Sequence, residues 1–427
     1  MKTVGIIAEY NPFHNGHLYQ MQEARRCAGA DYVVVAMSGD FVQRGEPALL
    51  DKWTRAGMAL AAGADLVLEL PVRVSAGSAE FFARGGVSLL SSLGVVDALS
   101  FGYESVPTSA SIPSDQGIPS DRSIQKDLQC LSQAADFFSR EETDVYKKEL
   151  KTLLAAGRTY AQARVEAYTR TEIADTTVPA DLLKSPNNIL AVEYLKAIRQ
   201  LKSRLSVIPV PRLGAGYHDS ALPMKDTADL AAVGLASPAS ASGIRSALSR
   251  KESVTPYMPQ DAYELMTEQL AENRSLVPSD LDLLLHESLL RLKDHLEEYQ
   301  DVGIDLANRI RALLGEYTGF ESFAMRIKTR QVTLTRVKRA LIHILLGIKK
   351  SSDPAAYARV LGFRQTAQPL LHRISQESSV PMITKLPKEL PEGLEEDLHA
   401  AHIWEMLVCH KTGKPLCSEY QRQLVIL

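Results

Sequence analysis

Short apolar runs alternate with longer amphipathic segments over the first quarter of the chain. The runs predict β-strands, since they are rich in Val, Ile and Leu and are bounded by polar or glycine residues. The strand-like runs are 4–8, 32–37, 66–70 and 98–101, and the helix-like segments are 17–28, 52–62 and 79–93. Repeated β-α-β units of this kind predict an α/β fold with a parallel sheet.

The pattern continues with a helix at 189–201 and a strand at 205–210, and it changes near 253–259. Beyond this point the chain is rich in leucine and charged residues, and apolar residues recur at spacings of three and four residues, as in amphipathic helices. We therefore expect two domains, an α/β domain at 1–255 and a mainly helical domain at 256–427. Within the first, the Ser/Pro-rich segment 105–123 predicts a surface loop insertion.

Composition narrows the class of protein. The 427 residues are 45% hydrophobic and 23% charged with a net charge of −3, which is typical of a globular protein. No run approaches the roughly 20 apolar residues of a membrane helix, and the first apolar run is too short for a secretory signal. Four cysteines without metal-type or disulfide-type spacing favour a reducing compartment. We expect a cytoplasmic protein without membrane association.

The strongest chemical signal is the sequence NPFHNGH at 11–17, which lies between the first strand and the first helix. A helix amino terminus offers unpaired N–H groups to an anion, and Gly16 allows a phosphate to approach closely. His14 and His17 could face one phosphate and stabilise charge that develops during its transfer. Two alternatives stay open, namely loop and N-cap residues, or a zinc site, which nearby ligands do not complete.

Five blocks of sequence resemble one family. They are GIIAEYNPFHNGH, MSGDFVQRGEPA, DLVLELP, SPNNILAVEY and RLGAGYHD. In this order they are similar to the bacterial tRNA(Met) cytidine acetate ligases of the H-x-G-H nucleotidyltransferase superfamily. The resemblance implies a Rossmann-like nucleotidyltransferase domain that forms acetyl-adenylate from acetate and ATP, with Mg²⁺. The acetyl group then passes to N4 of the wobble cytidine of elongator tRNA(Met).

The resemblance also implies which residues contact ATP. They are Ile7, Ala8, Glu9, Tyr10, Asn11, Pro12, Phe13, His14, Asn15, Gly16, His17, Leu18, Tyr19, Gln20, Gly102, Asn187 and Arg212. Ordinary roles remain open for three positions: Gly102 as a turn residue, Asn187 or Asn188 as an N-cap, and Arg212 as a solvated surface residue.

Two further sites are less well defined. Residues 240–245 resemble the second phosphate motif of the superfamily, with Ser242 and Arg245 as ligands, although Gly243 departs from the pattern and an ordinary capped helix is the alternative. Asp40 follows the second strand and could orient Mg²⁺ or the cytidine amine. A capping or salt-bridge role is the alternative for Asp40.

The segment 326–350 contains eight Lys and Arg residues and no acid, so it could follow an RNA backbone. We expect Arg330, Arg336, Lys338 and Arg339 to contact tRNA, whereas a solvated helix face is the ordinary explanation. Two other functions stay open. One is a small-molecule adenylyltransferase of the same superfamily, and the other is a non-catalytic RNA-binding protein.

Overall fold

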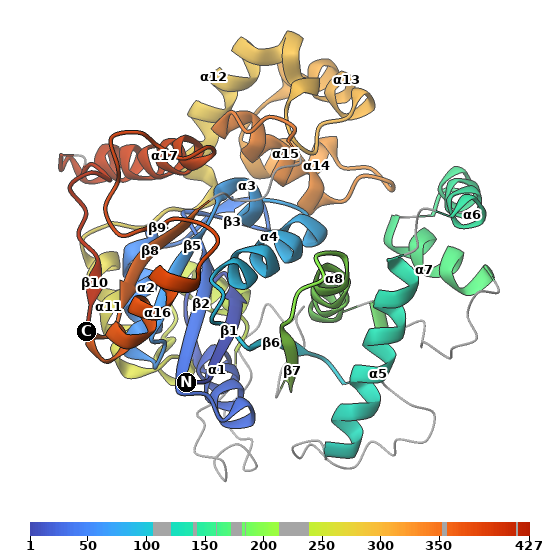
Figure 1. The fold of residues 1–427 in the computed structure, drawn as a ribbon. Helices are drawn as coiled ribbons and strands as arrows, with labels where there is room; N and C mark the ends of the chain where they lie inside the picture. Colours follow the sequence, from blue (N-terminus) through green and yellow to red (C-terminus); the bar gives the residue numbers. More distant parts are fainter. Residues whose placement is uncertain are drawn as a thin grey trace.

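The fold is built on one twisted sheet (Figure 1). The computed structural model describes residues 1–105, 121–139, 143–158, 160–171, 182–183, 185–212, 239–351, 357–415 and 417–427. The strands run in the order β10-β8-β5-β2-β1-β6-β7, and β9 lies beside β8. They are β1 (Thr3–Ala8), β2 (Tyr32–Ser38), β5 (Leu66–Leu70), β6 (Ala98–Tyr103), β7 (Ser206–Pro211), β8 (Ala358–Phe363), β9 (Met382–Ile383) and β10 (Val425–Ile426).

The strands predicted from the first quarter of the chain pair in parallel, as expected for β-α-β units. One layer of helices comprises α1 (Asn15–Ala28), α2 (Lys52–Ala61), α10 (Ala241–Ser249) and α11 (Gln260–Ala271). The opposite layer comprises α3 (Val72–Ser75), α4 (Ala79–Ser92) and α8 (Pro186–Gln200), with α5 (Asp121–Phe138), α6 (Asp144–Ala155) and α7 (Tyr160–Arg170) beyond α8. The α/β fold class is thus confirmed.

Burial on both faces explains why β2 reads as an unbroken apolar run. Val33 and Val35 belong to the core beneath α1 and α2, whereas Val34 and Ala36 belong to the core beneath α4 and α8. Alternate side chains of a strand point to opposite faces, so a central strand covered on both sides has no polar face. Gly86 lets α4 approach β1 closely, because a Cβ there would lie 2.6 Å from Cδ1 of Ile7.

The carboxyl-terminal half is largely helical. Its helices are α12 (Asp282–Leu292), α13 (Ile304–Leu313), α14 (Phe320–Ile327), α15 (Leu334–Leu346), α16 (Gln368–Glu377) and α17 (Leu394–Thr412). Short 3-10 helices lie at Thr255–Tyr257, Pro278–Leu281, Lys293–Glu298, Leu314–Glu316 and Gln365–Ala367. All of these α-helices except α16 share a core that includes Phe323 and Trp404, and Trp404 Nε1 donates to the carbonyl of Ala48 at 3.0 Å. No described helix is long and apolar enough to span a bilayer.

The boundary expected at 255/256 does not separate a sheet from a helical domain. Strand β8 pairs antiparallel with β5, and β9 and β10 then pair with β8, so residues beyond 357 extend the amino-terminal sheet. Ala358, Val360 and Leu361 on β8 are buried, and this burial draws the strand into the sheet. The loop insertion expected at 105–123 falls mostly on 106–120, outside the described residues, and α5 begins at Asp121.

Five charged residues form a buried ionic cluster where β2, β5, β8 and α2 meet. Lys52 Nζ lies 2.8 Å from Glu69, 3.1 Å from Glu419 and 3.6 Å from Asp40, and Arg359 lies 3.1 Å from Glu69 and 2.5 Å from Glu419. Three carboxyl groups thus face two cations. Burial raises the pKa of Asp40 to about 7, which lessens the excess of negative charge at neutral pH.

Candidate active site

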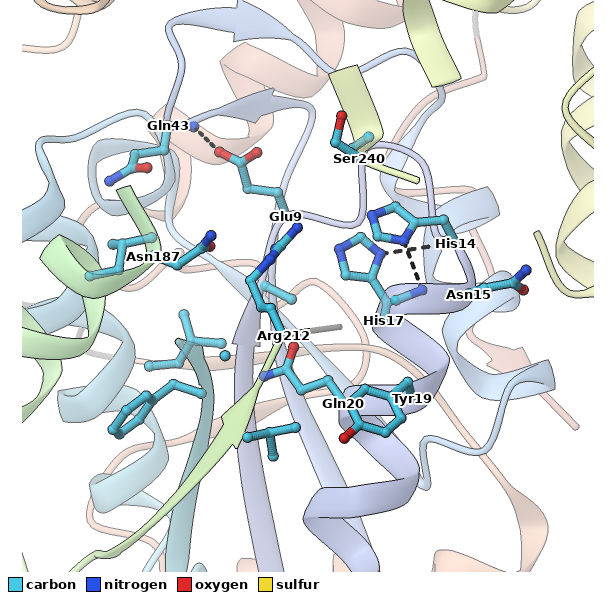
Figure 2. A pocket seen from close by; sticks show the side chains of 18 of the residues that line it. Glu9, His14, Asn15, His17, Tyr19, Gln20, Gln43, Asn187, Arg212 and Ser240 are labelled. Atoms are coloured by element: carbon cyan, nitrogen blue, oxygen red, sulfur yellow. Dashed lines mark hydrogen bonds between the residues drawn. The ribbon is translucent and has the colours of Figure 1, made fainter. Parts of the chain in front are cut away.

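A cavity of about 190 Å³ opens beyond the carboxyl ends of β1, β6 and β7, beside the amino terminus of α1 (Figure 2). Ligands of open α/β sheets bind at this edge. The residues that line the cavity are Ile7, Ala8, Glu9, His14, Asn15, Gly16, His17, Tyr19, Gln20, Gln43, Arg44, Phe82, Phe101, Gly102, Asn187, Leu190, Tyr194, Val210, Pro211, Arg212, Ala239, Ser240, Ala241 and Arg245.

The two histidines cap helix α1 and stack on each other. His14 is the N-cap, and its Nδ1 accepts from the N–H of Gly16 at 3.1 Å, while Nδ1 of His17 accepts from the N–H of His14 at 3.3 Å. The ring centroids lie 3.7 Å apart. Because each Nδ1 is an acceptor, a neutral ring carries its proton on Nε2. The N-cap and phosphate-binding hypotheses are therefore compatible, since capping uses Nδ1 alone.

Both imidazoles are neutral at physiological pH. Burial, with a smaller contribution from the positive charge of Arg212, lowers the pKa of His14 to about 3. Burial, His14 and Arg212 together hold the pKa of His17 well below its usual range. Helix α1 carries no acid in its first turn, so its positive dipole end is not offset there. This corner of the cavity thus presents two N–H donors and a helix terminus to an anion.

The predicted contacts at 7–20 divide into two groups. Ile7, Ala8, Glu9, His14, Asn15, Gly16, His17, Tyr19 and Gln20 line the cavity, whereas Tyr10, Asn11, Pro12, Phe13 and Leu18 do not. Tyr10 and Phe13 are buried in the core beneath α1, and Oδ1 of Asn11 accepts from the N–H of Leu49 at 2.8 Å. The second group therefore shapes the loop, while contact of the fourteen residues with ATP stays a prediction.

The predicted residues Gly102, Asn187 and Arg212 all line the cavity. A Cβ at Gly102 would have only ordinary contacts, the nearest at 3.7 Å with Cγ of Arg212, so this glycine leaves space rather than avoiding a clash. Asn187 donates to Glu104 at 2.9 Å, and the buried Asn188 bonds to the backbone of Glu104. The N-cap of α8 is Ser185, so neither asparagine has that role.

At the start of α10, the cavity is lined by Ser240 and Arg245 but not by Ser242. Ser240 is the N-cap and accepts from the N–H of Gly243 at 3.0 Å, and Ser242 lies 3.1 Å from the Ser240 hydroxyl. Arg245 donates to the carbonyl of Asn11 at 2.7 Å, which ties α10 to the histidine loop. Ser240 is therefore the serine of this motif that reaches the cavity, while the contact of Ser242 with phosphate stays a prediction.

Asp40 does not line the cavity, and its catalytic role stays a prediction. Its Oδ1 accepts from the backbone N–H of Lys52 at 2.8 Å, and its carboxyl group belongs to the buried ionic cluster. The capping and salt-bridge alternative describes this residue. Sequence could not exclude the catalytic role, because Lys52 and Glu69 become its neighbours only through the fold.

Four of the eight basic residues in the segment 326–350 pair with acids from elsewhere in the chain. Lys338 Nζ lies 2.7 Å from both Glu46 and Glu321, and Arg339 lies 2.9 Å from Asp301. Arg326 pairs with Glu316, and Lys349 with Glu298. Lys338 and Arg339 are thus already paired within the chain, and their contact with tRNA stays a prediction. Arg330 and Arg336 are exposed and have no acidic partner among the described residues.

Several cavity residues were not predicted individually. Gln43 lies in the polar segment that follows β2, so its position after a strand was a usable signal. Phe82, Phe101, Leu190 and Tyr194 form an apolar wall, and the Phe101 and Tyr194 ring centroids lie 5.9 Å apart. Apolar residues of this kind look like ordinary core in a sequence, so no local signal distinguishes them.

This placement of neutral donors at the first β-α turn is typical of nucleotide-binding α/β enzymes. The family model described as HIGH Nucleotidyl Transferase matches residues 1–114 and 120–416, so the chain is a nucleotidyltransferase of this class.

Similar proteins narrow the class further. The tRNA(Met) cytidine acetate ligase of Acetivibrio thermocellus is 33% identical over 449 residues, which cover 100% of both chains. That of Caldicellulosiruptor saccharolyticus is 36% identical over 92% of this chain and 90% of its own. The chain belongs to the tRNA(Met) cytidine acetate ligase family.

A solved structure has the same fold. The crystal structure of Thermotoga maritima TmcAL bound with alpha-thio ATP superposes with a TM-score of 0.82 at 26% identity and covers 100% of both chains. The apo form of that protein gives a TM-score of 0.84 at 26% identity, with 100% of this chain and 99% of that chain covered.

Proposed function

We propose that this protein is a tRNA(Met) cytidine acetate ligase, which activates acetate with ATP and transfers the acetyl group to N4 of the wobble cytidine in elongator tRNA(Met). One observation carries the proposal. The stacked pair of neutral imidazoles, His14 and His17, has its Nε2 donors available to a cavity of nucleotide-binding type, in a chain that matches this ligase family over its whole length. The reaction takes place in the cytoplasm, where tRNA is found.

The geometry of the cavity supports the proposed first step. An acetate oxygen attacks the α-phosphorus of ATP, the bond to the bridging oxygen breaks, and pyrophosphate leaves with the electron pair. Donors fixed at the histidine corner stabilise the charge on the phosphoryl oxygens without a covalent enzyme intermediate. The described residues contain no group of three His, Cys, Asp or Glu side chains placed to hold a metal. Mg²⁺ bound with ATP would offset the negative charge of the phosphates.

The test is mass analysis of tRNA nucleosides after incubation with the protein, ATP and isotope-labelled acetate. We expect labelled N4-acetylcytidine in elongator tRNA(Met) and none when ATP is omitted or the wobble cytidine is replaced by uridine. Pyrophosphate release that needs a phosphorylated small molecule, without any tRNA product, would instead indicate a small-molecule adenylyltransferase. RNA binding with no pyrophosphate release would indicate a non-catalytic binding protein.

Arg212→Ala should weaken ATP binding. Its guanidinium lines the cavity near the two histidines, and a charge-assisted hydrogen bond contributes about 1.5–3 kcal/mol, equivalent to a roughly 10- to 100-fold rise in Kd. Isothermal titration calorimetry with ATP measures this change. Arg204→Ala is the matched control. Arg204 is exposed and lies just before the first residue of β7, at the opposite end of the strand from Arg212. Equal Kd values for the two variants would remove Arg212 from the nucleotide site.

We propose further that tRNA contacts the exposed cations Arg330 and Arg336. Helix α15 packs directly on the turn between β3 (Phe41–Val42) and β4 (Glu46–Pro47). The contact is close, since a Cβ at Gly45 would lie 2.4 Å from the backbone nitrogen of Arg339. Gln43 and Arg44 of the same turn line the cavity. A nucleic acid that crosses the start of α15 is therefore close to the proposed acetyl-transfer site.

Replacing both Arg330 and Arg336 with Gln should weaken tRNA binding and make it less dependent on salt. The logarithm of the binding constant falls as the logarithm of the salt concentration rises. Each lost phosphate contact makes this fall less steep, by about 0.7 to 0.9 in slope. Fluorescence anisotropy at several salt concentrations measures the slope. Lys349→Gln with Lys350→Gln is the control of equal charge, because Lys349 is ion-paired and Lys350 Nζ donates to the carbonyl of Glu297. An unchanged slope in the arginine variant would contradict the proposed contact.

A further inference from the structure

Glu9 is an acidic side chain in a cavity that otherwise presents mainly donors and cations. It follows β1, and one of its carboxylate oxygens accepts from the backbone N–H of Gln43 at 2.9 Å (Figure 2). The positive charges of Arg44 and Arg245 act on it, and Arg55 holds its carbonyl oxygen at 2.7 Å. Such a carboxylate is anchored at one oxygen, which fixes its direction, while the group remains part of the cavity wall.

The charge of Glu9 suits neither phosphate nor acetate. A carboxylate repels both anions, and this repulsion is strong where little water screens it. Its complement is an N–H donor, and the tRNA substrate of the proposed function brings one to the reacting centre as the N4 amine of cytidine. Glu9 also contacts the β3–β4 turn, against which α15 packs, so successive contacts join it to the helix that carries Arg336.

We propose that Glu9 is the catalytic base of acetyl transfer, the group that accepts the proton of the cytidine N4 amine. This proposal rests on the proposed function. The nitrogen attacks the carbonyl carbon of acetyl-adenylate, and a new C–N bond forms. The bond from that carbon to the phosphate oxygen breaks, and AMP leaves with the electron pair. The proton that the nitrogen loses passes to the Glu9 carboxylate and then to water.

The surroundings of Glu9 favour this role. Burial raises the pKa of Glu9, and this effect is opposed by Arg44, Arg245 and the bond from Gln43 and reinforced by Glu46. The charge of Arg55 also acts on Glu9, and Tyr194 faces it as a protonated phenol, because burial raises the pKa of Tyr194. A carboxylate with a raised pKa is a stronger base than one in water, and it is still ionised when the pH lies above that pKa.

The two half-reactions separate this role from others. Glu9→Gln keeps an acceptor for the Gln43 N–H but cannot take a proton. We expect acetyl transfer to slow by about 10²- to 10⁴-fold. Acetate-dependent exchange of pyrophosphate into ATP should fall by a much smaller factor, although Glu9 lines the same cavity. Transfer is measured in a single turnover, by adding tRNA to enzyme that has already formed labelled acetyl-adenylate. Glu9→Asp, which keeps the carboxylate, should recover part of the transfer rate.

A pH profile gives an independent readout. The single-turnover transfer rate of the wild type should rise with pH through the pKa of Glu9 and then level off, whereas the Glu9→Gln rate should not show this rise. Glu23→Gln is the control variant, since Glu23 pairs with Arg26 on the outer side of α1. Thermal unfolding checks that each variant is folded.

Two results would overturn the inference. A loss of exchange in Glu9→Gln as large as the loss of transfer would place the carboxylate in the first half-reaction, and normal transfer would remove it from the second. If the wild type itself forms no acetylated tRNA, the proposed function fails and the role of Glu9 fails with it. Wild-type acetylation combined with a normal variant would overturn the role of Glu9 alone.

Discussion

Replacing His17 with alanine should lower the rate of acetate-dependent pyrophosphate exchange by about 10²- to 10³-fold, the range found when one fixed donor to a developing oxyanion is removed. Its Nδ1 is used in capping, so Nε2–H is the donor that the ring offers to a phosphoryl oxygen. The low pKa of the imidazole makes the donor neutral, so its contribution should not change between pH 6 and 8. Exchange of labelled pyrophosphate into ATP measures the effect.

Two further variants separate capping from catalysis at His17. Asparagine places an acceptor near the position of Nδ1, so His17→Asn should preserve the cap of α1 but not the exchange activity. Glutamine places an amide N–H near the position of Nε2, so His17→Gln should retain more activity than alanine. If all three variants exchange pyrophosphate at the wild-type rate, His17 acts only as a capping residue.

Lys52→Met should cost about 3–5 kcal/mol of the free energy of unfolding, because it removes one cation from a buried network and leaves Glu69 and Glu419 with Arg359 alone. Lys52 is 0% exposed, so water cannot replace its ammonium group. Urea denaturation followed by circular dichroism gives the free energy, and a lower midpoint with an unchanged slope is the expected result.

Lys349→Met is the matched control for this stability change. Lys349 lies 2.8 Å from Glu298, as close as Lys52 lies to Glu69, but its side chain is 64% exposed. Exposed ion pairs contribute about 0–1 kcal/mol, so the control should change stability little. Similar losses in both variants would show that burial of Lys52 does not determine its contribution.

The fold could be predicted where local patterns and tertiary structure agree. The strands β1, β2, β5 and β6 are short apolar runs set between amphipathic helices, and this alternation is visible without knowing the contacts. Strand β8 was missed because ARVLGF is a short run within a helical region and carries an arginine. Only the fold supplies Glu69 and Glu419, which make a buried Arg359 acceptable at that position.

The site, too, could be predicted only where the local sequence carries the information. Position alone pointed to His14, Gly16 and His17, since the first β-α turn of a parallel sheet is a defined place. The role of a charged side chain could not be predicted from its position in the sequence. The segment 326–350 contains no acid, yet Glu46 and Asp301, which are distant in sequence, neutralise Lys338 and Arg339. Whether a charged side chain is free or paired depends on contacts that the local sequence does not contain.

The antiparallel pairing of β8 with β5 has a consequence for how the protein is made. On the ribosome, Leu66–Leu70 emerges long before Ala358–Phe363, and until then the outer edge of β5 has no strand beside it. An open edge of apolar residues can pair with another chain and cause aggregation. Premature termination between these two segments should therefore produce insoluble fragments rather than a shorter soluble enzyme, and nascent chains should need chaperones throughout this interval.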